Sequence, residues 1–126
     1  MTIFKGESDS MGIRVGIDLG TTFSAVARIN TDTGKPEMIK NSFGCPLTPS
    51  VLCFEPDGNI LFGEDAKGMQ GTGNTNAVAF FKRNMGNEQF CVEFFGKTYS
   101  ATDLSAILLK NLVEEAERSS GAKIDA

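Results

Sequence analysis

Near the start of the chain, Asp18, Gly20, Thr21 and Thr22 fall within one short stretch. Gly20 has no Cβ, so the backbone can turn tightly there and approach a ligand closely. The N–H groups of such a turn can face an anion, and the threonine hydroxyls add donors. The Asp18 carboxylate suits Mg²⁺, either directly or through its water shell. These residue types fit a phosphate site, but they equally fit an ordinary hairpin turn that serves only the fold.

A second candidate is Lys82. Residues 76–85 begin with an asparagine and end before Gly86, a pattern that predicts a short helix. Lys82 and Arg83 then fall in its last turn, where cations complement the helix dipole. Taken alone, this pattern favours a solvated lysine at a helix end over a functional one.

The composition excludes several classes of site. The chain has 126 residues, a net charge of −4 and no histidine, which rules out histidine-based acid–base catalysis and disfavours zinc. It shows no basic stripe for nucleic acid and no apolar run near the ~20 residues that span a bilayer. Cys45, Cys53 and Cys91 lack metal-site spacing and predict free thiols in a reducing compartment. We therefore expect a cytoplasmic protein whose partners include neither nucleic acid nor membrane.

The candidate turn lies between two strand-like runs. Residues 13–29 alternate apolar and small or polar side chains on both sides of the turn, which predicts a β-hairpin. A cluster of turn residues follows, and residues 36–40 then predict a third strand of an antiparallel meander. Residues 1–10 are polar and aperiodic and predict a loose tail.

The rest of the chain alternates strands and helices. Residues 50–54 and 59–62 flank a Glu-Pro-Asp-Gly turn and predict a second hairpin. Residues 64–69 predict a short helix, and residues 90–95 predict a strand that pairs with residues 97–99.

The last predicted element is a long amphipathic helix. Residues 100–121 have apolar side chains at helical spacing, a Ser100–Asp103 capping pair and a C-terminal Gly121. Residues 122–126 look like the start of a strand parallel to the first. The wide apolar face of the helix needs a sheet, so the pattern predicts an α/β fold and an incomplete domain.

Four stretches occur in a fixed order along the chain: residues 16–24 (Gly-Ile-Asp-Leu-Gly-Thr-Thr-Phe-Ser), residues 47–51 (Leu-Thr-Pro-Ser-Val), residues 81–86 (Phe-Lys-Arg-Asn-Met-Gly) and the helix over residues 100–121. Together they resemble the Hsp70 heat-shock chaperone family. The first stretch resembles the family's first phosphate-binding hairpin, and the other three resemble later landmarks. The resemblance covers nearly the whole chain from Met11 onward.

The resemblance implies roles for particular residues. Asp18 matches the aspartate that holds the water shell of Mg²⁺. Lys82 matches the lysine associated with hydrolysis of the γ-phosphate, so the resemblance favours its functional interpretation. The resemblance implies ATP or ADP with Mg²⁺ as the ligand. The loop that touches the β- and γ-phosphates of ATP is matched by Gly20, Thr21, Thr22 and Phe23.

The resemblance also implies a fold and partners. It implies a ribonuclease H-like, actin-like ATPase half-lobe, with residues 1–12 as a disordered tail. Residues 13–40 and 98–126 would form the first part of the lobe, and residues 41–97 an inserted β-rich subdomain with short helices. Unfolded peptide clients and co-chaperones would be the partners of a full-length parent. Phe23 departs from the family's usual Asn or Tyr. Cys45 lies in a segment that is usually more polar, and the segment at residues 87–97 is short, and both features indicate a divergent, compact member.

Two other functions remain open. Carbohydrate kinases of the same superfamily also begin with an Asp-x-Gly-Thr-Thr/Ser hairpin, although the Thr-Pro-Ser and Phe-Lys-Arg stretches argue against them. The chain could also be an inactive folding fragment, because the family's second phosphate loop would lie beyond Ala126. We therefore expect weak ATP binding by the chain alone, and self-association through an unpaired edge of the first strand.

Overall fold

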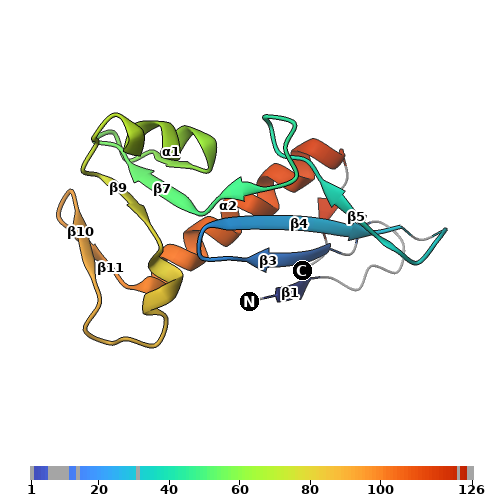
Figure 1. The fold of residues 1–126 in the computed structure, drawn as a ribbon, viewed down its shortest axis with the longest axis horizontal. Helices are drawn as coiled ribbons and strands as arrows, with labels where there is room; N and C mark the ends of the chain where they lie inside the picture. Colours follow the sequence, from blue (N-terminus) through green and yellow to red (C-terminus); the bar gives the residue numbers. More distant parts are fainter. Residues whose placement is uncertain (1, 6–11, 14, 31, 122, 125–126) are drawn as a thin grey trace.

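The computed structural model of the chain describes residues 2–5, 12–13, 15–30, 32–121 and 123–124. One sheet is crossed by a long helix, and a second sheet, a short helix and a small hairpin lie toward one end (Figure 1). The elements are β1 (Thr2–Lys5), β2 (Gly12–Ile13), β3 (Val15–Leu19), β4 (Phe23–Ile29), β5 (Pro36–Ile39), β6 (Thr48–Pro49), β7 (Val51–Phe54), β8 (Ile60–Phe62), α1 (Glu64–Gly71), β9 (Ala77–Ala79), the 3-10 turn η1 (Phe81–Asn84), β10 (Val92–Phe94), β11 (Lys97–Tyr99), α2 (Ala101–Ser120) and β12 (Lys123–Ile124).

The predicted meander is confirmed. β3 and β4 form an antiparallel hairpin whose last pair before the turn is Leu19 opposite Ser24. β5 pairs with β4 as the third strand. β6 also pairs with β4, with Phe23 opposite Pro49. This pairing brings residues 48–50 beside the turn between β3 and β4.

Helix α2 has the predicted ends. The Ser100 hydroxyl accepts a hydrogen bond from the Asp103 N–H, and the Asp103 carboxylate accepts one from the Ser100 N–H. This reciprocal capping satisfies N–H groups that the first turn of a helix leaves without partners. At the other end, Gly121 adopts a left-handed φ of 69°, which glycine reaches without a Cβ penalty.

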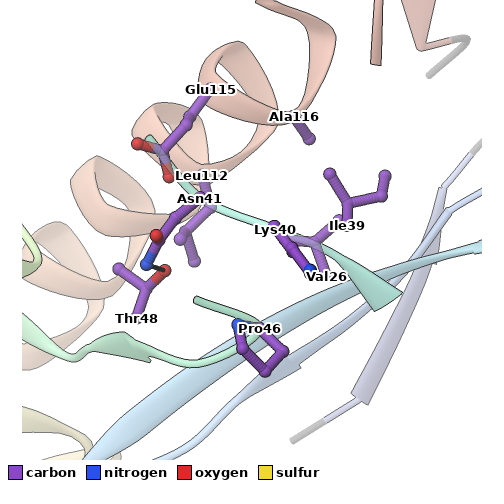
Figure 2. Close-up of a pocket in the computed structure, with 9 residues that line it drawn as sticks. All are labelled: Val26, Ile39, Lys40, Asn41, Pro46, Thr48, Leu112, Glu115 and Ala116. Carbon is purple, nitrogen blue, oxygen red and sulfur yellow. Dashed lines mark hydrogen bonds between the residues drawn. The ribbon is translucent and has the colours of Figure 1, made fainter. Parts of the chain in front are cut away.

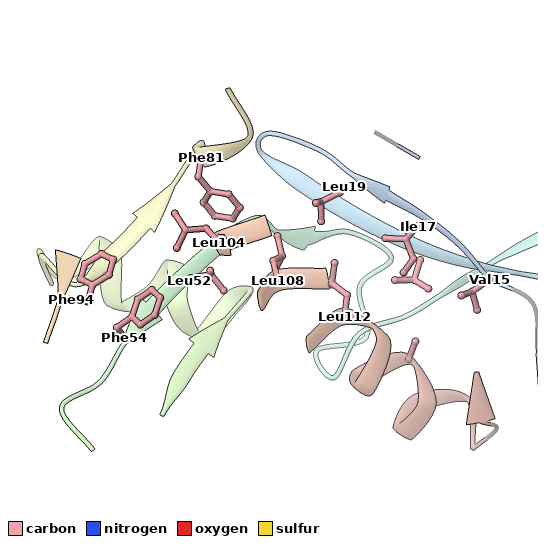
Figure 3. Packing of buried hydrophobic residues seen from close by; sticks show 12 residues of the cluster. Val15, Ile17, Leu19, Leu52, Phe54, Phe81, Phe94, Leu104, Leu108 and Leu112 are labelled. Atoms are coloured by element: carbon pink, nitrogen blue, oxygen red, sulfur yellow. The ribbon is translucent and has the colours of Figure 1, made fainter. Parts of the chain in front are cut away.

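One hydrophobic cluster joins the sheet to α2. β3 alternates buried and less buried side chains, so one face of the strand turns toward the helix. The apolar stripe of α2 lies against that face (Figure 3), and the contributing side chains are Val15, Ile17 and Leu19 from β3 and Leu104, Leu108 and Leu112 from α2. Leu52, Phe54, Phe81 and Phe94 extend the same cluster toward the second sheet. The division of the chain into a first lobe part (residues 13–40 and 98–126) and an inserted β-rich subdomain (residues 41–97) stays a prediction.

The second sheet has the order β8-β7-β9, and α1 packs against it. The hairpin of β7 and β8 and the pairing of β10 with β11 confirm the predicted strands. The rings of Phe54 and Phe94 stack with centroids 4.5 Å apart, which ties the small β10–β11 hairpin to β7. Among the described residues, neither helix combines the length and hydropathy that a bilayer-spanning segment needs.

The helix predicted for residues 76–85 is wrong. Ala77–Ala79 form strand β9 on the edge of β7, and Phe81–Asn84 form only a 3-10 turn. Phe80 separates them with a left-handed φ of 58°, a conformation that a helix interior does not contain. The pairing partner of β9 lies far away in the sequence, so local periodicity could not reveal it.

The loose tail predicted at the N-terminus is wrong for Thr2–Lys5. These residues form β1, which pairs antiparallel with β3 along the edge that was expected to be free. The edge of β3 on which the expected self-association rested is therefore occupied over Val15–Asp18, and β1 is now the outer strand of this sheet. Residues 1 and 6–11 lie outside the described part. β12 pairs parallel with β2, which confirms the predicted direction of the strand after α2.

Candidate functional site

The turn between β3 and β4 requires a glycine. A Cβ built on Gly20 would lie 2.2 Å from the carbonyl oxygen of Phe23, far inside van der Waals contact. The conflict is with backbone, so rotation of a side chain cannot relieve it. Gly20 therefore lets the chain close this turn, as the sequence predicts.

Ser50 holds two carbonyl groups of the turn. Its hydroxyl donates a hydrogen bond to the Gly20 oxygen at 2.8 Å, and its N–H donates one to the Thr22 oxygen at 2.9 Å. The hydroxyl oxygens of Ser24 and Ser50 are also 2.8 Å apart. Because the single proton of Ser50 goes to Gly20, Ser24 is the donor in this second contact.

The other predicted phosphate-contacting residues line the turn. Thr21 is half-buried, while Thr22 and Phe23 are exposed. The Lys67 ammonium group of α1 lies 5.3 Å from the centroid of the Phe23 ring, within the range of a cation–π interaction. Asp18 has an exposed position near the end of β3, opposite Ala25 on β4.

Lys82 lies on η1, next to the turn. Its neighbour Phe81 is fully buried in the same hydrophobic cluster as Leu19, the last residue of β3. Figures 1 and 3, which view the molecule from different sides, both place η1 beside the tip of the β3–β4 hairpin. Lys82 itself is half-buried. The structure thus places the segment that carries Lys82 beside the tip of the hairpin whose first strand carries Asp18.

Two hollows elsewhere on the surface are poor candidates for a phosphate. The first, between α2 and the segment after β5 (Figure 2), has a volume of about 10 Å³. That volume holds roughly one water molecule. The second has a volume of about 220 Å³, and three carboxylates line it, those of Glu64, Asp65 and Glu115, with one cation, Arg118. The excess of negative over positive side chains in this hollow disfavours binding of an anion.

Glu115 joins α2 to the loop that follows β5. Its Oε2 atom accepts hydrogen bonds from the Ser42 hydroxyl at 2.6 Å and from the Ser42 N–H at 3.4 Å. The Asn41 amide, from the same loop, donates to the Thr48 hydroxyl at 3.0 Å (Figure 2). These contacts have a structural role, because they fix the loop that leads into β6.

The three cysteines differ in accessibility. All are free thiols; Cys45 and Cys91 are exposed, whereas Cys53 is buried in β7. Burial raises the pKa of the Cys53 thiol, and the nearby Glu55 carboxylate raises it further. Since the thiolate is the reactive form, Cys53 should be inert in the folded chain.

We expect iodoacetamide to modify Cys45 and Cys91 in the native chain, and Cys53 only after unfolding. Peptide mass spectrometry over a time course measures this difference. Because the folded-state pKa is raised, the unfolded state releases the proton first as pH rises above the usual value of about 8.5. The stability contributed by Cys53 is therefore lost above that pH, and Cys53→Ala should flatten the pH–stability curve there. Equal labelling rates for Cys53 and Cys45 in the native chain would contradict this prediction.

A model of the Hsp70 protein family matches residues 14–92. This span is more than half of the chain, and it contains the turn, Ser50 and η1. The chain belongs to the Hsp70 family. Membership of the Hsp70 family supports assignment of this region to the nucleotide-binding domain of an Hsp70-type chaperone, and it favours that assignment over a carbohydrate kinase.

In this Hsp70-family chain, two contacts at the turn could not be predicted from the sequence. Ser24 is 26 positions from Ser50, and Lys67 reaches Phe23 from a different element. The Thr-Pro-Ser stretch was a usable signal, because it marks the segment that contacts the turn. Thr48 and Pro49 of this stretch form β6, and the pairing of β6 with β4 gives the stretch a structural role.

Proposed function

We propose that the turn between β3 and β4 binds the phosphate groups of ATP or ADP together with Mg²⁺, as part of the nucleotide site of an Hsp70-type chaperone. The observation that carries the proposal is the tight Gly20 turn, which no other residue type fits, within a chain of this family. Such a turn offers backbone N–H donors to an anion, and Thr21 and Thr22 add hydroxyl donors.

The donor set fits the proposed ligand. The exposed Asp18 carboxylate, beside the turn, would hold Mg²⁺ through its water shell. When bound, Mg²⁺ supplies positive charge that offsets the charge of the phosphate oxygens. Lys82 would neutralise charge that develops on the γ-phosphate and help to orient the attacking water. The position of η1 beside the turn supports this role.

The wider function follows from the family. We propose that the chain adopts the fold of an actin-like ATPase lobe, and that in an Hsp70-type protein ATP hydrolysis is coupled to the binding of peptide clients, with co-chaperones as partners. The turn is one of the two phosphate loops that such a site uses. The affinity of this chain by itself is therefore expected to be weak.

Titration of the isotope-labelled chain with MgADP, followed by amide NMR spectra, tests the proposal. We expect the shift changes to be largest at residues 20–23 and at Lys82. Adenosine, which has no phosphate, is the matched control and should leave these amides unchanged. A response confined to other residues, or an equal response to adenosine, would contradict a phosphate site at this turn.

A further inference from the structure

The contacts of Ser50 go beyond the structural role of the Thr-Pro-Ser stretch. Ser24 and Ser50 are among the most buried polar residues described, with exposed fractions of 1% and 2%. A buried hydroxyl is costly unless it is hydrogen-bonded, so this pair depends on its geometry. The proton order is fixed: Ser24 donates to Ser50, and Ser50 donates to the Gly20 carbonyl. This series of hydrogen bonds therefore ends at the turn between β3 and β4.

The two contacts of Ser50 determine the direction of two peptide groups. In a planar trans peptide, the C=O and N–H bonds point in opposite directions. Ser50 binds the carbonyl oxygens of Gly20 and Thr22. The N–H groups of those same peptides belong to Thr21 and Phe23, so both must point away from Ser50. One residue thus orients two of the donors that the proposed site needs.

We propose that Ser50 is a positioning residue for the phosphate turn: it acts through the Gly20 and Thr22 carbonyls to hold the Thr21 and Phe23 amides in place for a phosphate. This role rests on the proposed nucleotide site, because it specifies how that site is kept in shape before the ligand arrives. Donors that are already oriented lose less conformational freedom on binding. Ser50 does not touch the phosphate itself.

The chain contains a matched control. Ser50→Ala removes the hydroxyl contact with Gly20, whereas Ser24→Ala removes the partner hydroxyl and leaves the contact between Ser50 and Gly20 intact. Both substitutions remove one buried hydroxyl from the same pair. Ser50→Cys keeps nearly the size of serine with only a weak donor, so it separates the hydrogen bond from a cavity effect.

The first measurement needs no ligand. Amide hydrogen exchange and backbone relaxation of residues 20–23 should show increased motion in Ser50→Ala and Ser50→Cys, but not in Ser24→Ala. The second measurement is the affinity for MgADP from amide shifts. We expect Ser50→Ala and Ser50→Cys to bind up to roughly tenfold more weakly, as for the loss of about 1.4 kcal/mol, and Ser24→Ala to bind as the unsubstituted chain does.

The outcomes separate the two proposals. If the turn of the unsubstituted chain does not respond to MgADP, the nucleotide site is wrong, and with it the role of Ser50. If it responds, and Ser50→Ala and Ser50→Cys bind with unchanged affinity, only the role of Ser50 is overturned. Equal weakening by Ser24→Ala would also overturn that role, because the pair would then act through packing alone. Thermal unfolding of all variants shows whether they lose similar stability.

Discussion

Leu108→Ala should lower the free energy of unfolding by about 2–5 kcal/mol, the usual cost of emptying a buried leucine site. Leu108 is fully buried in the cluster between α2 and the sheet. Leu108 lies among buried side chains of both layers (Figure 3). Its removal takes apolar contacts from both layers and leaves a cavity, because the surrounding structure relaxes only partially. Since small domains have ~5–15 kcal/mol of stability in total, a loss of this size is severe.

Urea unfolding followed by far-ultraviolet circular dichroism measures this loss. Leu109→Ala is the matched control, because it makes the same chemical change one position along α2 at a half-buried side chain. The control should lose clearly less stability. Equal losses for the two variants would contradict the placement of the buried face of α2.

Gly20→Ala should disrupt the turn and abolish its response to MgADP. The new Cβ would lie 2.2 Å from the Phe23 oxygen, so the backbone must move and the peptide groups held by Ser50 must move with it. We expect a loss of roughly 1–3 kcal/mol of stability, as for other overpacked sites. Amide shifts of residues 20–23, with and without MgADP, measure the effect on the turn.

Gly68→Ala provides the control for this substitution. A Cβ at Gly68, inside α1, would meet no atom within 4 Å. Alanine there should be neutral or stabilise the chain by ~0.5–1 kcal/mol, because glycine is unfavourable in a helix interior. A Gly20→Ala variant that keeps the spectrum and the MgADP response of the unsubstituted chain would contradict the steric argument.

The sequence predicted those parts of the fold that depend on local chemistry. The capping of α2 by Ser100 and Asp103, the turn between β7 and β8, and the alternation of β3 each depend on neighbouring residues. β9 and β1 were missed because each strand exists only through pairing with a distant partner. Local propensity cannot supply that information.

The same distinction applies to the candidate site. Asp18, Gly20 and the threonines form one contiguous motif, so their proximity follows from the sequence. The position of η1 next to the turn depends on the burial of Phe81 in the shared cluster, which only the fold provides. The contacts of Ser50 with the turn span 30 positions, so no window of sequence contains both partners.

The pairing of β1 with β3 and of β12 with β2 has a consequence for engineering. Thr2 lies opposite Asp18, and Ile124 lies opposite Ile13. Asp18 is five positions after Ile13, so the two residues lie at most about 17 Å apart, at ~3.3 Å per residue. A short flexible peptide could thus connect these two segments in a circularly permuted chain. New ends could then be opened in the exposed turn at residues 56–58, away from the β3–β4 hairpin.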